Sequence, residues 1–193
     1  MSVYCVIDRS GSMQACKTDT IGGFNAFLEE QDPETIININ LFDHEYKELY
    51  SGLVKDAPKL SEKTFVPRGN TALLDAIGKT IKKADGAGAS GTPIIVILTD
   101  GDENSSHEYN KLHIKDLIED RTKLGWNFVF LAANQDAIMS AKEYGMSPLS
   151  AMTFTPDNVD VALRSASSAI KRSRGTQNTQ VMFSQEERMA SNY

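Results

Sequence analysis

Short apolar runs alternate along this chain with segments in which apolar residues recur every three or four positions. The runs are rich in β-branched and aromatic residues and predict buried strands over residues 3–8, 35–42, 93–99, 127–132 and 150–154. The intervening segments predict helices, marked by Ile21, Phe24 and Leu28, by Leu73, Leu74, Ile77, Ile81 and Ala84, by Ile114, Leu117, Ile118 and Leu124, by Ala141 and Tyr144, and by Val159, Leu163, Ala166 and Ile170. Such alternation is typical of an α/β protein.

Two of the strand candidates are apolar on both faces. They are IIVIL, residues 94–98, and FVFL, residues 128–131, and a parallel strand covered by helices on each side requires this composition. The connection between residues 36–42 and 46–50 is too short for a parallel crossover, so residues 46–50 are predicted to form an antiparallel edge strand. The predicted fold is therefore α/β, with a doubly wound, mostly parallel central sheet, one antiparallel edge strand and helices on both faces.

Length and composition limit the number of domains and the kinds of partner that the chain can have. Its 193 residues suit a single domain, expected over residues 1–174, while residues 175–193 are polar and expected to be either docked through Val181, Met182 and Phe183 or disordered. The formal net charge of −6 argues against a nucleic-acid partner. No apolar run approaches the roughly 20 residues of a membrane helix, and no secretion signal is recognised, so a cytoplasmic protein without membrane attachment is expected.

Polar residues gather in three segments that can reach the same edge of the predicted sheet. DRSGSM, residues 8–13, ends the first strand; TDGDEN, residues 99–104, follows a central strand; and RGNTAL, residues 68–73, precedes a helix. In open α/β sheets the functional crevice lies outside the carboxyl ends of the strands. The side chains expected to converge there are Asp8, Ser10, Ser12, Thr71 and Asp100.

These five side chains form an oxygen-only ligand set of two carboxylates and three hydroxyls, without an imidazole. Oxygen ligands with few charges suit Mg²⁺ or Mn²⁺, which keep several waters and an octahedral shell, better than Zn²⁺. A cation with so little compensating charge remains electrophilic and attracts a further anion. The sequence thus predicts a metal site that is open to an anionic partner.

The three polar segments resemble the metal-ion-dependent adhesion site (MIDAS) of the von Willebrand factor A (VWA) domain family. The family pattern is Asp-x-Ser-x-Ser in a first loop, a Thr in a second loop and an Asp after the fourth strand, and DRSGSM, RGNTAL and TDGDEN match it in that order. The resemblance spans about residues 3–170. Within it FVFLAANQDA, residues 128–137, resembles the fifth strand and following helix of stand-alone prokaryotic and phage members.

The resemblance implies a role for each matched residue. Ser10, Ser12 and Thr71 would bind the metal directly, and Asp8 and Asp100 either directly or through water. An Asp or Glu of a partner protein would complete the octahedron. The implied function is a cytoplasmic, non-enzymatic protein–protein interaction module, such as an adaptor.

An enzymatic alternative is a Mg²⁺-dependent phosphatase or other phosphoryl-transfer enzyme with Asp8 as nucleophile. Enzymes of the haloacid dehalogenase type carry a second Asp two positions on, where this chain has Ser10. Three scattered histidines also leave little for acid–base chemistry. The binding module is therefore the favoured hypothesis.

Five further polar residues are candidates for contact with a partner around the metal. Arg9 lies between predicted ligands and is expected to be exposed at the rim, where it would guide an acidic partner. Asp43 and His44 are expected in the turn of the predicted hairpin, and Asp102 and Glu103 in the loop after the fourth strand. The alternative is a solvated side chain for Arg9 and an ordinary polar turn or loop for the other four, and for those four it is the favoured interpretation.

Overall fold

One mixed sheet organises the chain, for which a computed structural model describes residues 1–88, 91–133, 137–175 and 180–191. The strands of these residues are β1 (Ser2–Asp8), β2 (Ile36–Phe42), β3 (Tyr46–Leu53), β4 (Ile94–Thr99), β5 (Asn127–Ala133) and β6 (Ala151–Phe154). They form a sheet of order β3-β2-β1-β4-β5-β6. Only the pair β2 and β3 is antiparallel among these strands, which confirms the predicted topology.

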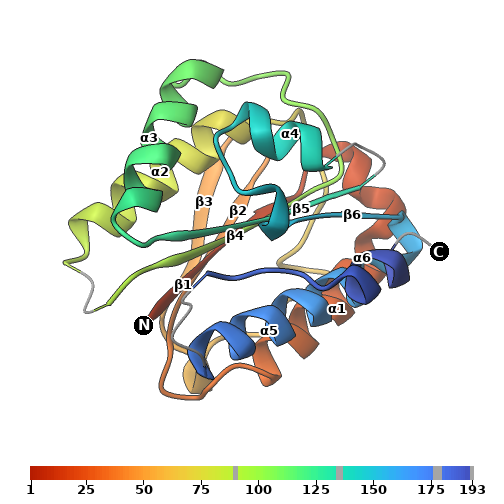
Figure 1. Cartoon of the computed structure of the whole chain (residues 1–193). Coiled ribbons are helices and arrows are strands. Elements are labelled where there is room, and N and C mark those ends of the chain that lie inside the picture. Colours follow the sequence, from red (N-terminus) through yellow and green to blue (C-terminus); the bar gives the residue numbers. More distant parts are fainter. Residues whose placement is uncertain (89–90, 134–136, 176–179, 192–193) are drawn as a thin grey trace.

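Helices cover both faces of the sheet (Figure 1). On one face lie α1 (Lys17–Glu29) and α5 (Val159–Gly175), and on the other lie α2 (Leu73–Gly86), α3 (Lys111–Lys123) and α4 (Ala137–Glu143). Shorter helical segments are η1 (Gly11–Cys16), η2 (Val54–Asp56), η3 (Pro148–Ser150), η4 (Pro156–Asn158) and α6 (Gln185–Ala190). Within the described ranges, none of these helices has the length and apolar character needed to cross a membrane.

The central strand β1 is covered by apolar side chains on both faces. Val3, Cys5 and Ile7 belong to the core beneath α1 and α5, whereas Tyr4 and Val6 belong to the core beneath α2 and α3. Alternate residues of a strand point to opposite faces, so a shift of one residue would exchange the two sets. This packing fixes the register of β1 and with it the place of its last residue.

The segment of residues 180–191 packs against the body of the fold. Val181 and Phe183 are buried in the core on the α5 side of the sheet. Ser184 and Glu187 form a reciprocal capping box that begins α6. The Glu187 carboxylate also lies 2.7 Å from the guanidinium of Arg172 in α5, which ties the two helices together.

Parts of two sequence predictions lie outside the described residues. They are residues 176–179 and 192–193 of the predicted polar tail, and residues 134–136 of the segment that resembles stand-alone prokaryotic and phage members.

Candidate metal centre

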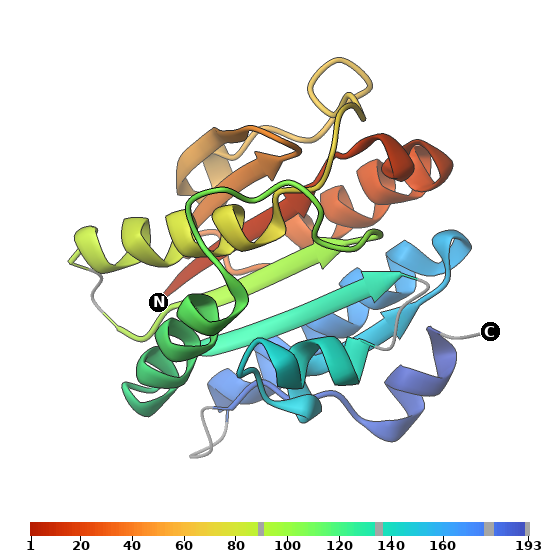
Figure 2. The same ribbon diagram turned by 90° about the horizontal axis from the view of Figure 1, so that it is seen from above.

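The candidate ligands lie where the direction of the sheet topology reverses. The chain proceeds from β1 outward to β2 and β3, and later from β4 outward to β5 and β6. Figure 2 shows the parallel strands β4 and β5 pointing the same way, so their carboxyl ends reach one edge of the sheet. Asp8 ends β1 and Asp100 directly follows β4, the two strands on either side of this switch point. Ligand sites of open α/β sheets form at such positions.

The first loop holds Asp8 in a fixed orientation. Asp8 is fully buried; its Oδ1 accepts a hydrogen bond of 2.6 Å from the backbone N–H of Ser10, and its Oδ2 accepts one of 2.7 Å from the hydroxyl of Thr99. Sequence analysis did not single out Thr99, although it immediately precedes Asp100. Since both oxygens are held by neighbours, the carboxylate is oriented before any ligand arrives.

Direct side-chain contacts join the first loop to the loop after β4. Ser10 Oγ lies 3.1 Å from Ser12 Oγ, and Ser12 Oγ donates a hydrogen bond of 2.7 Å to Asp100 Oδ1. The structure therefore brings Asp8, Ser10, Ser12 and Asp100 into one connected group, although 88 residues separate Ser12 from Asp100 in sequence. This convergence is what the sequence pattern predicted.

Thr71 reaches the same group from the loop before α2. A Cβ placed on Gly101 would lie 3.4 Å from Thr71 Oγ1 and 3.6 Å from Ser12 Oγ, so both hydroxyls border one point. Asn104 secures this loop, because its Oδ1 accepts from Thr71 N at 2.9 Å and its own N–H donates to Thr71 O at 3.0 Å. Asn104 is a second residue that sequence analysis did not assign to the site.

The two carboxylates of this group are in an environment that disfavours their charge. Burial raises the pKa of Asp8 to about 6; hydrogen bonds from Thr99 and Ser10 oppose the increase, and the nearby Asp100 carboxylate adds to it. Burial also raises the pKa of Asp100, and a hydrogen bond from Ser12 opposes this. Two mutually repelling carboxylates beside three hydroxyl oxygens are a donor set that fits a hard divalent cation.

Arg9 is not exposed, and the sequence-based expectation for it is wrong. Its side chain is 8% exposed and its Nε lies 3.0 Å from Oδ2 of Asp43, which is fully buried. The cause is the turn between β2 and β3, which places Asp43 directly against the first loop. His44, in the same turn, and Asp102, in the loop after β4, are exposed as expected for rim residues.

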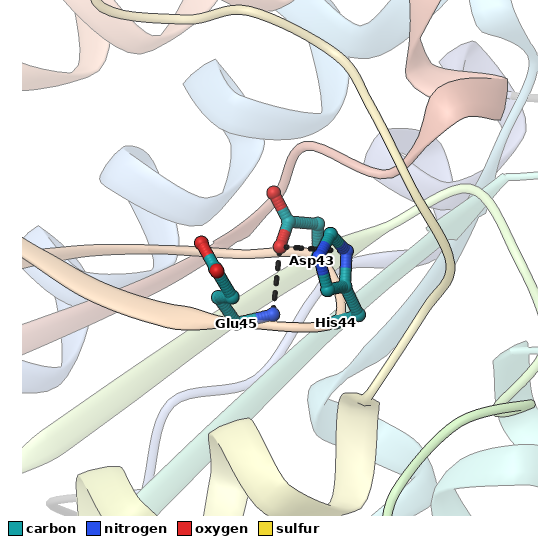
Figure 3. A group of neighbouring side chains, drawn as sticks. All are labelled: Asp43, His44 and Glu45. Atoms are coloured by element: carbon teal, nitrogen blue, oxygen red, sulfur yellow. Dashed lines mark hydrogen bonds and ion pairs between the residues drawn. The ribbon is translucent and has the colours of Figure 1, made fainter.

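The acidic turn of Asp43, His44 and Glu45 has three ligand-type atoms within 4.8 Å of one another (Figure 3). Asp43 Oδ2, however, lies 2.9 Å from Nε of Arg68, and the Glu45 carboxylate also pairs with Arg68. Arg9 Nε also lies 3.0 Å from the same Oδ2 of Asp43. Because guanidinium groups already neutralise this turn, we assign it to the scaffold of the site and not to a second cation.

Glu103 supports the loop of Thr71 by capping a helix. Its Oε2 accepts from the backbone N–H of Leu74 in the first turn of α2 at 2.9 Å, and its Oε1 accepts from the N–H groups of Ser105 and Ser106. A carboxylate at a helix N-terminus also interacts favourably with the helix dipole. The described contacts of Glu103 are therefore intramolecular, and its predicted contact with a partner remains a prediction.

Comparison with known proteins identifies the fold. No protein-family profile matches the sequence, and no curated protein matches it in sequence. Among solved structures, the ArnB paralog VWA2 from Sulfolobus acidocaldarius is similar with a TM-score of 0.61 and 18% identity over 86% of this chain and 44% of that one.

Two further similar structures are those of metal-loaded proteins. Proximal thread matrix protein 1 from the mussel byssus, with a zinc-occupied MIDAS motif, gives a TM-score of 0.62 at 14% identity over 84% of this chain and 46% of that one. Manganese-loaded TRAP protein from Plasmodium vivax gives 0.52 at 17% identity over 68% of this chain and 56% of that one. The present chain thus spans about half of each of these proteins. It has the VWA fold, as the sequence resemblance implied.

Proposed function

We propose that this protein is a metal-dependent protein–protein interaction module. Asp8, Ser10, Ser12, Thr71 and Asp100 would hold Mg²⁺, or Mn²⁺ in its place, and an Asp or Glu side chain of a partner would bind that metal. The single observation that carries the proposal is the hydrogen-bonded chain from Asp100 through Ser12 to Ser10, at the switch point of a VWA fold. The metal-bearing neighbours of similar fold support the same reading.

The chemistry of the donors explains why an acidic partner is the expected ligand. Asp8 and Asp100 supply two negative charges, and the hydroxyls of Ser10, Ser12 and Thr71 supply none. When bound, a divalent cation would provide an electrophilic centre for one more oxygen ligand. A single metal–carboxylate bond is a small contact, so the loops around it must supply much of the affinity and the specificity.

The geometry of Asp8 favours this role over that of a nucleophile. A nucleophilic carboxylate must approach the phosphorus of its substrate directly, whereas Asp8 is fully buried and both of its oxygens accept hydrogen bonds; it would still act on a metal through a bridging water. We therefore propose a non-enzymatic module. For its setting we propose the cytoplasm, which agrees with two buried cysteines that are free thiols, Cys5 and Cys16. Acidic composition supports a protein partner over nucleic acid.

The first test is calorimetric titration of the whole chain with Mg²⁺ and with Mn²⁺. Asp100→Asn should abolish or strongly weaken binding, because it removes one of the two charges that face the cation. The matched control is Asp102→Asn, which changes an exposed acid two residues further along the same loop. Equal loss in both variants would mean that general acidity attracts the cation, and it would refute the proposed site.

The second test concerns the partner. Proteins captured from the native host lysate on immobilised wild-type chain are compared between Mg²⁺ and chelator, and again with Asp100→Asn. A partner that binds only with metal and with Asp100 intact, and that loses binding when one of its own acidic residues is changed, supports the proposal. A partner indifferent to both metal and Asp100 contradicts it.

A further inference from the structure

One buried carboxylate connects the two loops that supply the proposed hydroxyl ligands. Asp43 Oδ2 forms an ion pair with Arg9 Nε at 3.0 Å, although this contact does not have the geometry of a hydrogen bond. The same oxygen accepts a hydrogen bond of 2.9 Å from Arg68 Nε. Arg9 lies between two proposed ligands of the first loop, and Arg68 stands three residues before Thr71. Asp43 thus holds a cationic side chain from each loop.

Backbone hydrogen bonds reinforce the same junction. The N–H of Ala72, next to Thr71, donates to the carbonyl of Asp43 at 2.8 Å. The N–H of Arg68 donates to the carbonyl of Arg9, also at 2.8 Å. The first of these bonds fastens the Thr71 loop to the turn that carries Asp43, and the second joins the Thr71 loop directly to the first loop.

Gly69 makes the junction close-packed. Its φ of 65° lies in the left-handed region, and a Cβ at this position would overlap the imidazole of His44. Its carbonyl accepts a hydrogen bond of 3.1 Å from the N–H of Gly11, between the two serines of the first loop. The Thr71 loop is therefore in contact with the turn at residues 43–45 on one side and with the first loop on the other. Figure 3 shows the side chains of that turn.

We propose that Asp43 is a positioning residue for the metal centre: through Arg9 and Arg68 it holds the Thr71 loop against the first loop and thereby sets the affinity for the metal. This inference rests on the proposed function. Asp43 itself contacts guanidinium groups and does not belong to the proposed ligand set. Its effect is on where the hydroxyls stand, not on the charge offered to the cation.

The requirement for such a residue follows from the ligands themselves. Mg²⁺ needs oxygens in near-octahedral geometry at about 2.0–2.1 Å, so a loop displaced by a fraction of an ångström loses a ligand. Neutral hydroxyls attract a cation only weakly, so this attraction does not by itself bring the loop that carries them into position at the metal. Residues that orient metal ligands typically account for about 10- to 100-fold in metal affinity.

The test compares Mn²⁺ affinity with fold stability in variants of the junction. Arg68→Gln is the primary variant, because its side chain is 46% exposed and Arg9 continues to neutralise Asp43. We expect its Mn²⁺ affinity to fall by about tenfold. Asp43→Asn should lose as much or more, and the double variant should bind no more weakly than Asp43→Asn alone, because both changes break the same connection.

Glu45→Gln is the matched control, since it removes the exposed carboxylate that pairs with the same Arg68 but leaves Asp43 in place. It should bind Mn²⁺ within about twofold of the wild type, as expected for a surface ion pair. All titrations are made where denaturation curves in chelator show complete folding. Wild-type affinity in both Arg68→Gln and Asp43→Asn would overturn this inference alone, whereas a wild-type chain that binds neither Mg²⁺ nor Mn²⁺ would refute the proposed function as well.

Discussion

Replacing Asp8 by Asn should make the metal-free protein more stable while it removes the response to metal. The side chain is fully buried, so its charge is costly when no cation is bound. An Asn keeps the shape and still offers an oxygen to the N–H of Ser10. The hydroxyl of Thr99 can donate to the carbonyl of Gly101, 3.1 Å away, in place of the lost acceptor.

The size of this effect follows from the pKa of Asp8. Burial raises it from the usual 3.8 to about 6, so the folded protein holds the proton more tightly than the unfolded chain does. The stabilisation of the metal-free fold by protonated Asp8 is complete below about pH 4 and is lost as the pH rises through about 6. At about 1.4 kcal/mol per pKa unit, the ionised carboxylate costs the metal-free fold about 3 kcal/mol at pH 8. Asn carries no such cost.

Urea denaturation of both proteins in chelator gives the comparison. The variant should be more stable than the wild type by up to about 3 kcal/mol at pH 8, and the difference should disappear near pH 4. Excess Mg²⁺ should then stabilise the wild type but not the variant. A variant that is less stable than the wild type at pH 8 in chelator would show that the Asp8 charge is satisfied inside the protein, and the reasoning would fail.

Three further changes test other parts of the structure. Thr71→Val keeps the shape but removes the hydroxyl, so Mn²⁺ affinity measured by titration should fall several-fold with little change in folding; unchanged affinity would exclude Thr71 as a ligand. Glu103→Gln weakens the cap of α2, and the free energy of unfolding should drop by about 1 kcal/mol in urea; no drop would contradict the capping role. Val181→Ala should cost about 2 kcal/mol in the same assay because Val181 is buried in the core; an unchanged midpoint would mean that residues 180–191 add no stability.

The fold was predictable because the information is local. Runs such as IIVIL and FVFL are apolar on both faces, and the short connection between β2 and β3 leaves an antiparallel pairing as the one compatible geometry. The switch-point rule then brings Asp8 and Asp100 together without any knowledge of long-range contacts. Helix α6 was not predicted, although the capping-box pattern of Ser184 and Glu187 was readable in the sequence.

The surroundings of the site were not predictable in the same way. Arg9 resembles an exposed residue in sequence, and nothing near it in the chain reveals that Asp43 lies against it. Asp43 itself looks like an ordinary turn residue until its contacts with two separate loops are known. Thr99 and Asn104 likewise gain their roles from Asp8 and Thr71. Sequence spacing indicates ligands, whereas the residues that orient ligands depend on tertiary packing.

The separation of the two halves of the site in sequence has a consequence for folding kinetics. The hydroxyl of Thr99 and the carboxylate of Asp8 are in contact across 91 positions, so β1 and β4 must pair before the site exists. Closing so long a loop in a parallel sheet is intrinsically slow. A nascent chain released only up to β3 would carry the Asp-x-Ser-x-Ser loop without Thr71 or Asp100. Metal capture should therefore follow assembly of the sheet centre, and Mg²⁺ should slow unfolding without speeding folding.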